Sequence, residues 1–129
     1  MAIASLNALV LTLTEEKASL EFLRTVIDAR RQVLTQRSAE LSAQYQDKML
    51  EEMRDWKDDE EANTSVMKFN MQQFQVEFDA AQARVDAEDQ MMQMERTNLD
   101  TKLEAISTSL ENVQKQLTKN TESEFKNMQ

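Results

Sequence analysis

The chain of 129 residues contains no glycine, proline, cysteine or histidine. At average usage, a chain of this length would hold about nine glycines and six prolines. Glycine supplies left-handed backbone for tight turns and proline stops helices, so without them tight turns and sharp helix stops become hard to build. Without cysteine, the chain cannot form disulfides, thiolate nucleophiles or Cys-type zinc sites. The residues that remain are rich in good helix formers, which predicts very long helices.

The chain is also poor in aromatic residues, which make up 5% of it, whereas 30% of it is charged. A compact globule of this length would carry more apolar mass, but two paired helices bury only a narrow stripe. Disorder is the competing interpretation for such a composition. The apolar positions are periodic, however, and this periodicity favours helices.

No long hydrophobic run is present. Residues 2–13 are apolar and uncharged, but they fall short of the roughly 20 residues that span a bilayer. They also lack a basic flank and a small-residue cleavage site. We therefore expect neither a transmembrane segment nor a cleaved signal peptide.

The first half of the chain has a row of large aliphatic residues at a spacing of seven. The row runs from Leu13 to Leu41 and then shifts phase toward Tyr45 and Trp56. The second half has a row with alternating spacings of four and three, which is clearest from Leu99 to Leu117. Such spacings are typical of coiled-coil helices. We call these rows the seam and predict that they pack against each other: Leu13, Leu20, Ile27, Leu34, Leu41, Phe74, Phe78, Val85, Leu99, Leu103, Ile106, Leu110, Val113 and Leu117.

The best place for a chain reversal is the polar segment Asp55–Ser65, close to the midpoint. Asp58 and Glu61 have capping-box spacing, and Asn63 is a candidate N-cap. If the chain folds back here, the numbers of facing residues sum to about 121, and apolar zones then face apolar zones. The sequence therefore predicts an all-α, antiparallel two-helix hairpin with its turn near residues 55–66. We expect one unit over residues 1–129, with arms at about 2–57 and 62–127.

The net charge of -9, from 15 basic and 24 acidic residues, argues against nucleic acid as a partner. Histidine and cysteine, frequent catalytic residues, are absent, and a two-helix hairpin encloses no pocket in which to shift a pKa. We expect no enzymatic activity, no cofactor and no small-molecule substrate. The acids at 55–61 lack the ligand spacing of a calcium loop, so we expect no metal site either.

Some charged and apolar residues do not fit the simple seam pattern. Arg30 and Arg37 stand at positions where a simple seam would place leucine. We expect them to pair with acids among Asp86, Glu88, Asp89 and Glu95, either across the arms or between neighbouring hairpins. Together with apolar residues near the chain ends, these are the candidates for a subunit interface: Ile3, Leu6, Val10, Arg30, Arg37, Asp86, Glu88 and Phe125.

The layout resembles the small helical-hairpin subunits of bacterial secretion needles and filaments, and their coiled-coil chaperones. The resemblance rests on the mid-chain turn at Asp55–Ser65, the apolar end Ala2–Leu13 and the seam Leu99–Leu117. It implies a structural subunit that self-assembles into a filament or another homopolymer, outside the cell or at its surface, with no catalytic residues. The alternative is a cytoplasmic coiled-coil chaperone or adaptor that binds a partner helix as a small oligomer.

Overall fold

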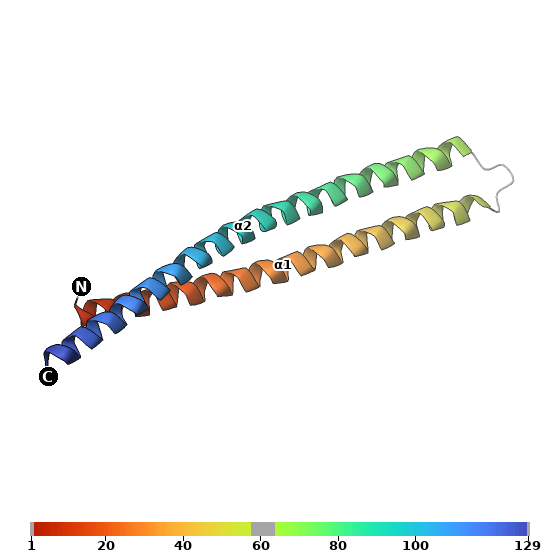
Figure 1. Cartoon of the computed structure of the whole chain (residues 1–129). Helices are drawn as coiled ribbons and strands as arrows, with labels where there is room; N and C mark the ends of the chain where they lie inside the picture. The colour runs from red at the N-terminus through yellow and green to blue at the C-terminus, as the bar shows by residue number, and fades with distance from the viewer. Residues whose placement is uncertain (1, 58–63, 129) are drawn as a thin grey trace. The chain divides into compact units, whose positions relative to one another are not determined.

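The computed structural model describes residues 2–57 and 64–128, which form two α-helices and no strand. Helix α1 spans Ile3–Lys57 and helix α2 spans Thr64–Asn127 (Figure 1). The predicted fold class, an all-α helical hairpin, is confirmed. The helices end and begin inside the segment where the reversal was expected. The candidate caps Asp58, Glu61 and Asn63 lie outside the described residues.

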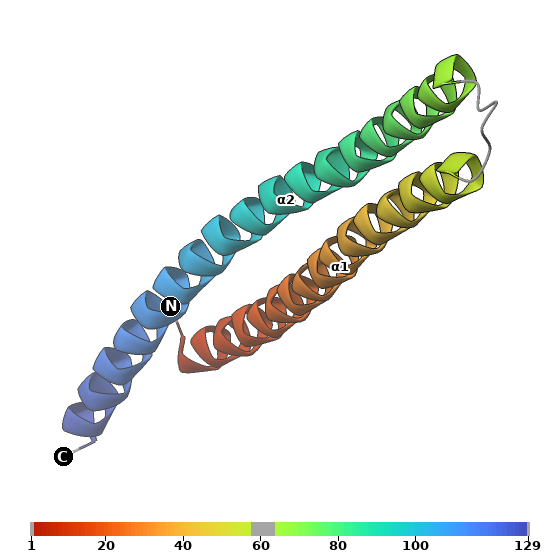
Figure 2. The ribbon, with the colours of Figure 1, turned by 90° about the vertical axis from the view of Figure 1, so that its right-hand side faces the viewer.

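The helices divide into two compact units. Unit 1 combines Met1–Asp28 with Met94–Gln129, and unit 2 is Ala29–Gln93. Within each unit, a segment of α1 packs antiparallel to a segment of α2 (Figures 1 and 2). In unit 2, for example, Tyr45 stacks on Phe78, as the predicted register requires.

The length of the helices follows from local chemistry. No described residue has a positive φ, so the lack of glycine carries no steric cost in these helices. Threonine, a weaker helix former, is accommodated because its hydroxyl bonds back to the preceding turn. Thr12 Oγ1, for example, donates to the carbonyl oxygen of Ala8 at 3.0 Å. Arg54 and Lys57 in the last turn of α1 complement the negative end of its dipole.

The core is a single narrow row because two helices share only one face. Among the described residues, its buried side chains are Leu6, Ile27, Leu99, Leu103 and Leu110 in unit 1 and Leu34 and Val85 in unit 2. The other predicted seam residues are half-buried: Leu13, Leu20, Leu41, Phe74, Phe78, Ile106, Val113 and Leu117. Each unit therefore has one buried stripe and leaves most of its surface exposed.

Candidate interaction surfaces

The described residues carry few features of a chemical site. Among residues 2–57 and 64–128, no group of three His, Cys, Asp or Glu side chains is placed to hold a metal ion. In the same part of the chain, no helix has an apolar stretch long enough to cross a bilayer. The surfaces that remain to be considered are the polar contacts between the helices, a groove and the exposed apolar faces.

In unit 1, a chain of ion pairs crosses between the helices beside the seam. Arg96 Nε of α2 donates to Asp28 Oδ1 of α1 at 2.6 Å. Arg96 Nη1 also reaches Asp100 Oδ2 at 3.4 Å, and Asp100 Oδ1 lies 3.5 Å from Arg24 Nη1. The hydrogen bond to Asp28, and then the charge of that carboxylate, raise the pKa of Arg96 above its ordinary value. The four charged groups thus link the two helices of unit 1.

In unit 2, Arg31 rather than the expected Arg30 or Arg37 forms an ion pair with an acid of the other helix. Arg31 Nε donates to Asp89 Oδ1 at 2.9 Å, with Arg31 Nη2 3.5 Å from Asp89 Oδ2. Arg30 and Arg37 are exposed, and neither lies within ion-pair distance of an acid among the described residues. The expectation that these two arginines pair across the arms is therefore wrong. Each residue turns the helix by about 100°, so Arg31 is directed toward α2 while its neighbour Arg30 is exposed.

Toward the end of α1 in unit 2, the contacts between the helices are made by aromatic and polar side chains instead of buried aliphatic ones. The Tyr45 and Phe78 rings stack with centroids 4.8 Å apart, and Lys48 Nζ lies 5.6 Å from the Phe74 centroid. Tyr45 also hydrogen-bonds to Gln75 through its hydroxyl. These contacts join α1 to α2 where no leucine of either helix is buried.

Near the end of α1, Glu52 connects the two helices of unit 2. Its Oε1 accepts a hydrogen bond from Trp56 Nε1 at 2.7 Å and one from Asn70 Nδ2 of α2 at 2.8 Å. Trp56 is half-buried and is the single tryptophan of the chain. One carboxylate thus fixes both an aromatic side chain of α1 and the first turns of α2.

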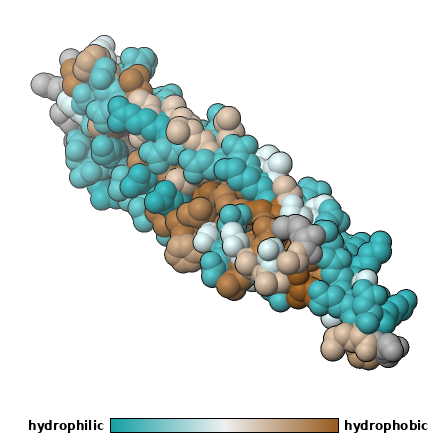
Figure 3. All heavy atoms as spheres, turned by 90° about the vertical axis from the view of Figure 1, so that its left-hand side faces the viewer, coloured by the Kyte–Doolittle hydropathy of each residue, from teal (hydrophilic) through white to brown (hydrophobic). Residues whose placement is uncertain are grey.

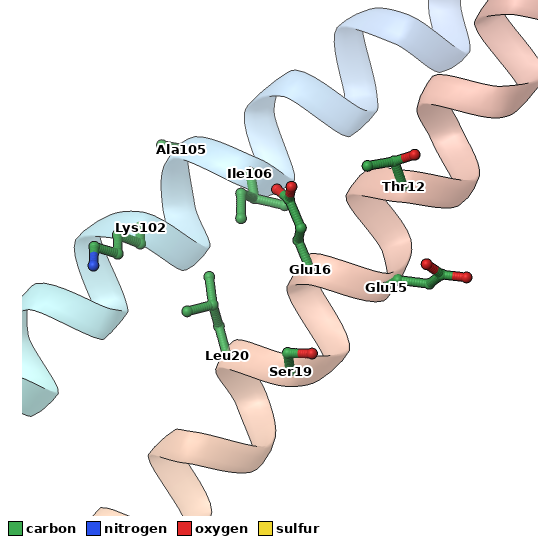
Figure 4. A pocket seen from close by; sticks show the side chains of 8 residues that line it. All are labelled: Thr12, Glu15, Glu16, Ser19, Leu20, Lys102, Ala105 and Ile106. Carbon is green, nitrogen blue, oxygen red and sulfur yellow. The ribbon is translucent and has the colours of Figure 1, made fainter.

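A groove of about 630 Å³ runs between the helices of unit 1 (Figure 4). Leu20 and Glu16 of α1 point toward Ile106 of α2 in this view. The apolar side chains lie beside charged ones, so the groove combines an apolar surface with a polar rim. Its lining residues are Thr12, Glu15, Glu16, Ser19, Leu20, Lys102, Ala105 and Ile106.

The interface candidates occupy different environments. Leu6 is fully buried in unit 1 (0% exposed), so its side chain packs within the chain and is not accessible to a second subunit. Ile3 and Val10 are half-buried. The exposed candidates are Arg30, Arg37, Asp86, Glu88 and Phe125. Of the acids expected beside the arginines, Asp86 accepts a hydrogen bond from Gln82 Nε2 of its own helix at 3.2 Å.

Large apolar side chains remain exposed on both units. Figure 3 shows hydrophobic side chains gathered in one area of the face that it presents, with hydrophilic ones around them. In unit 1 the set includes Leu11, Phe22, Leu23, Met94 and Phe125, and in unit 2 it includes Val33, Leu50, Met53, Phe69, Val76 and Met91. The exposure of Leu11 and Phe22, at 61% and 67%, was not predicted from the sequence. Their spacing of eleven residues is about three helical turns and was the available signal.

Comparisons with known proteins found no matching family model, no similar curated protein and no similar solved structure.

Proposed function

We propose that the protein is a structural subunit that self-assembles into a filament or another homopolymer. The exposed large apolar side chains on both units carry the proposal, above all Phe22 at 67% and Val76 at 62% exposure. Burying such side chains against another surface is favourable by about 25 cal/mol per Å², and where exposed apolar side chains adjoin in a large patch they mark an interaction site.

The test is electron microscopy of negatively stained, purified protein together with pelleting by ultracentrifugation. We expect fibres or large regular particles, and protein that pellets. Replacing Leu11, which is exposed in unit 1, with Glu leaves the helix content by circular dichroism unchanged and reduces the pelleted fraction. Deleting the first ten residues would be a less specific test than this substitution, because the deletion also removes Leu6, which is buried within unit 1. A protein that stays monomeric across concentrations contradicts the proposal.

A second candidate is a coiled-coil chaperone or adaptor, which the groove of unit 1 supports. A groove between two helices with an apolar surface at Leu20 and Ile106 can receive the apolar face of a partner helix. In that case purified protein forms small uniform particles rather than fibres. An Ile106→Glu variant then loses a partner helix, whereas Leu11→Glu retains it.

A further inference from the structure

Unit 2 exposes a basic face on α1. Val33 is 55% exposed, with Arg30 three residues before it and Arg37 four residues after it. Both arginines are exposed and have no acid within ion-pair distance among the described residues. The neighbouring residues Arg31 and Leu34 are directed to the seam, as their ion pair and burial show. Arg30, Val33 and Arg37 form what we call the basic face.

Unit 2 also exposes an acidic face on α2. Asp79 and Asp86 are exposed, with the exposed Ala83 between them and Val76 one turn earlier (62% exposed). Each aspartate accepts a hydrogen bond from a glutamine of its own helix, at 2.8 Å from Gln75 and 3.2 Å from Gln82. Neither has a cation within ion-pair distance in the part of the chain that the structure describes. Val76, Asp79, Ala83 and Asp86 form the acidic face.

The two faces match in charge, spacing and size. The arginines are seven residues apart and so are the aspartates, which corresponds to about 10 Å along either helix axis. The larger Val33 stands between the arginines and the small Ala83 between the aspartates, so a side chain can fill the space that alanine leaves. Ion pairs at the edges of an apolar helix contact set its partner and register.

The chain cannot bring its own two faces together. In unit 2, α1 and α2 already meet through Arg31 and Asp89 and through the seam residues Leu34 and Val85. Arg30 and Asp86 are left on exposed surfaces. The partner that supplies the complementary charge at the same spacing is therefore a second copy of this chain.

We propose that the basic face of one copy binds the acidic face of unit 2 in a second copy. This inference rests on the proposed function and specifies its interface. Because two different surfaces meet, the contact is heterologous, and every bound copy presents another basic and another acidic face. Such a contact propagates into an open assembly unless it closes into a ring.

The first test uses one blocking variant on each face. Val33→Glu blocks the basic face and Val76→Glu blocks the acidic face, while Leu50→Glu places the same charge at an equally exposed position of α1 (57%). By sedimentation, we expect each blocking variant alone to be lost from the pellet and Leu50→Glu to pellet like the wild type. An equimolar mixture of the two blocking variants retains one intact face of each kind. The mixture should therefore sediment as a larger particle than either blocking variant alone.

The second test reverses the charges, in case a blocking variant loses helix content by circular dichroism. Arg30→Glu with Arg37→Glu should abolish pelleting, and adding Asp79→Arg with Asp86→Arg in the same chain should restore it. Loss of pelleting by Leu50→Glu, a mixture that stays monomeric, or wild-type pelleting by the blocking variants overturns this interface and leaves self-assembly standing. A wild-type chain that never assembles overturns the proposed function and this inference together.

Discussion

Unit 1 and unit 2 pair the same two helices with different chemistry. Among the residues that the structure describes, unit 1 buries five aliphatic side chains, one of them completely, and a chain of four charged groups crosses beside them. In the described part of unit 2, the buried side chains are Leu34 and Val85. Toward the end of α1, unit 2 is held by stacked aromatic rings and by hydrogen bonds to Glu52.

The difference shows that the same pairing of two helices can be stabilised mainly by aliphatic burial or mainly by aromatic stacking and hydrogen bonds. Aliphatic burial in unit 1 is non-directional and scales with area. The contacts of unit 2 depend on geometry, and hydrogen bonds exchanged with water contribute little net stability. Regions with fewer buried apolar contacts open more readily. We therefore expect unit 1 to be the more stable of the two.

The largest effect is expected from Leu103→Ala in unit 1, where Leu103 is 7% exposed. Removing the buried side chain leaves a cavity and lowers the free energy of unfolding by about 2–4 kcal/mol. Urea unfolding followed by circular dichroism measures this loss. Leu11→Ala, at an exposed position of the same unit, should change stability by no more than about 0.5 kcal/mol. Equal effects of the two substitutions would mean that unit 1 has no distinct core.

A smaller effect is expected from Phe78→Leu in unit 2, because it removes the stack with Tyr45. The loss should be about 1 kcal/mol, and Phe69→Leu, at an exposed position of the same helix, serves as its control. Amide hydrogen exchange should show faster exchange in unit 2 than in unit 1 already in the wild type, with Phe78→Leu accelerating unit 2 further. Equal exchange rates in both units would contradict the expectation that unit 1 is the more stable one.

The ion pairs of unit 1 should contribute less, because their side chains are partly exposed to solvent. Arg96→Gln lowers the Tm at low ionic strength, and the difference shrinks in 1 M salt, where the Debye length is about 3 Å. Because the pKa of Arg96 is raised, its contribution is fully present below the ordinary arginine pKa and is lost only as the pH rises through the raised value. The Arg96→Gln difference should therefore be constant between pH 6 and 9. Lys115→Gln, which removes an exposed pair within α2, should have the smaller effect.

A small effect on stability is also expected from Glu52→Ala, which removes the acceptor shared by Trp56 and Asn70. Stability should fall by about 0.5–1 kcal/mol. The fluorescence of Trp56, the single tryptophan, should move to longer wavelength as its ring gains contact with water. Glu51→Ala, at the adjacent exposed position, should leave the emission unchanged.

Much of the fold could be predicted from the sequence because the relevant forces are local. Helix propensity and the absence of glycine and proline determine two long helices, and the polar segment after Lys57 determines where the first one stops. The repeats through Leu34, Val85 and Leu103 indicate the face that is buried, because apolar spacing alone defines a stripe on a helix.

Which side chains meet, in contrast, was decided by the tertiary structure. The sequence could not separate Arg30 from Arg31, since a one-residue step turns a side chain by about 100° and only the packed register fixes which one reaches Asp89. The same packing buried Leu6 within unit 1 and left Val33 and Val76 exposed. Apolar character by itself does not distinguish these outcomes, because burial depends on the second helix as well as on the first.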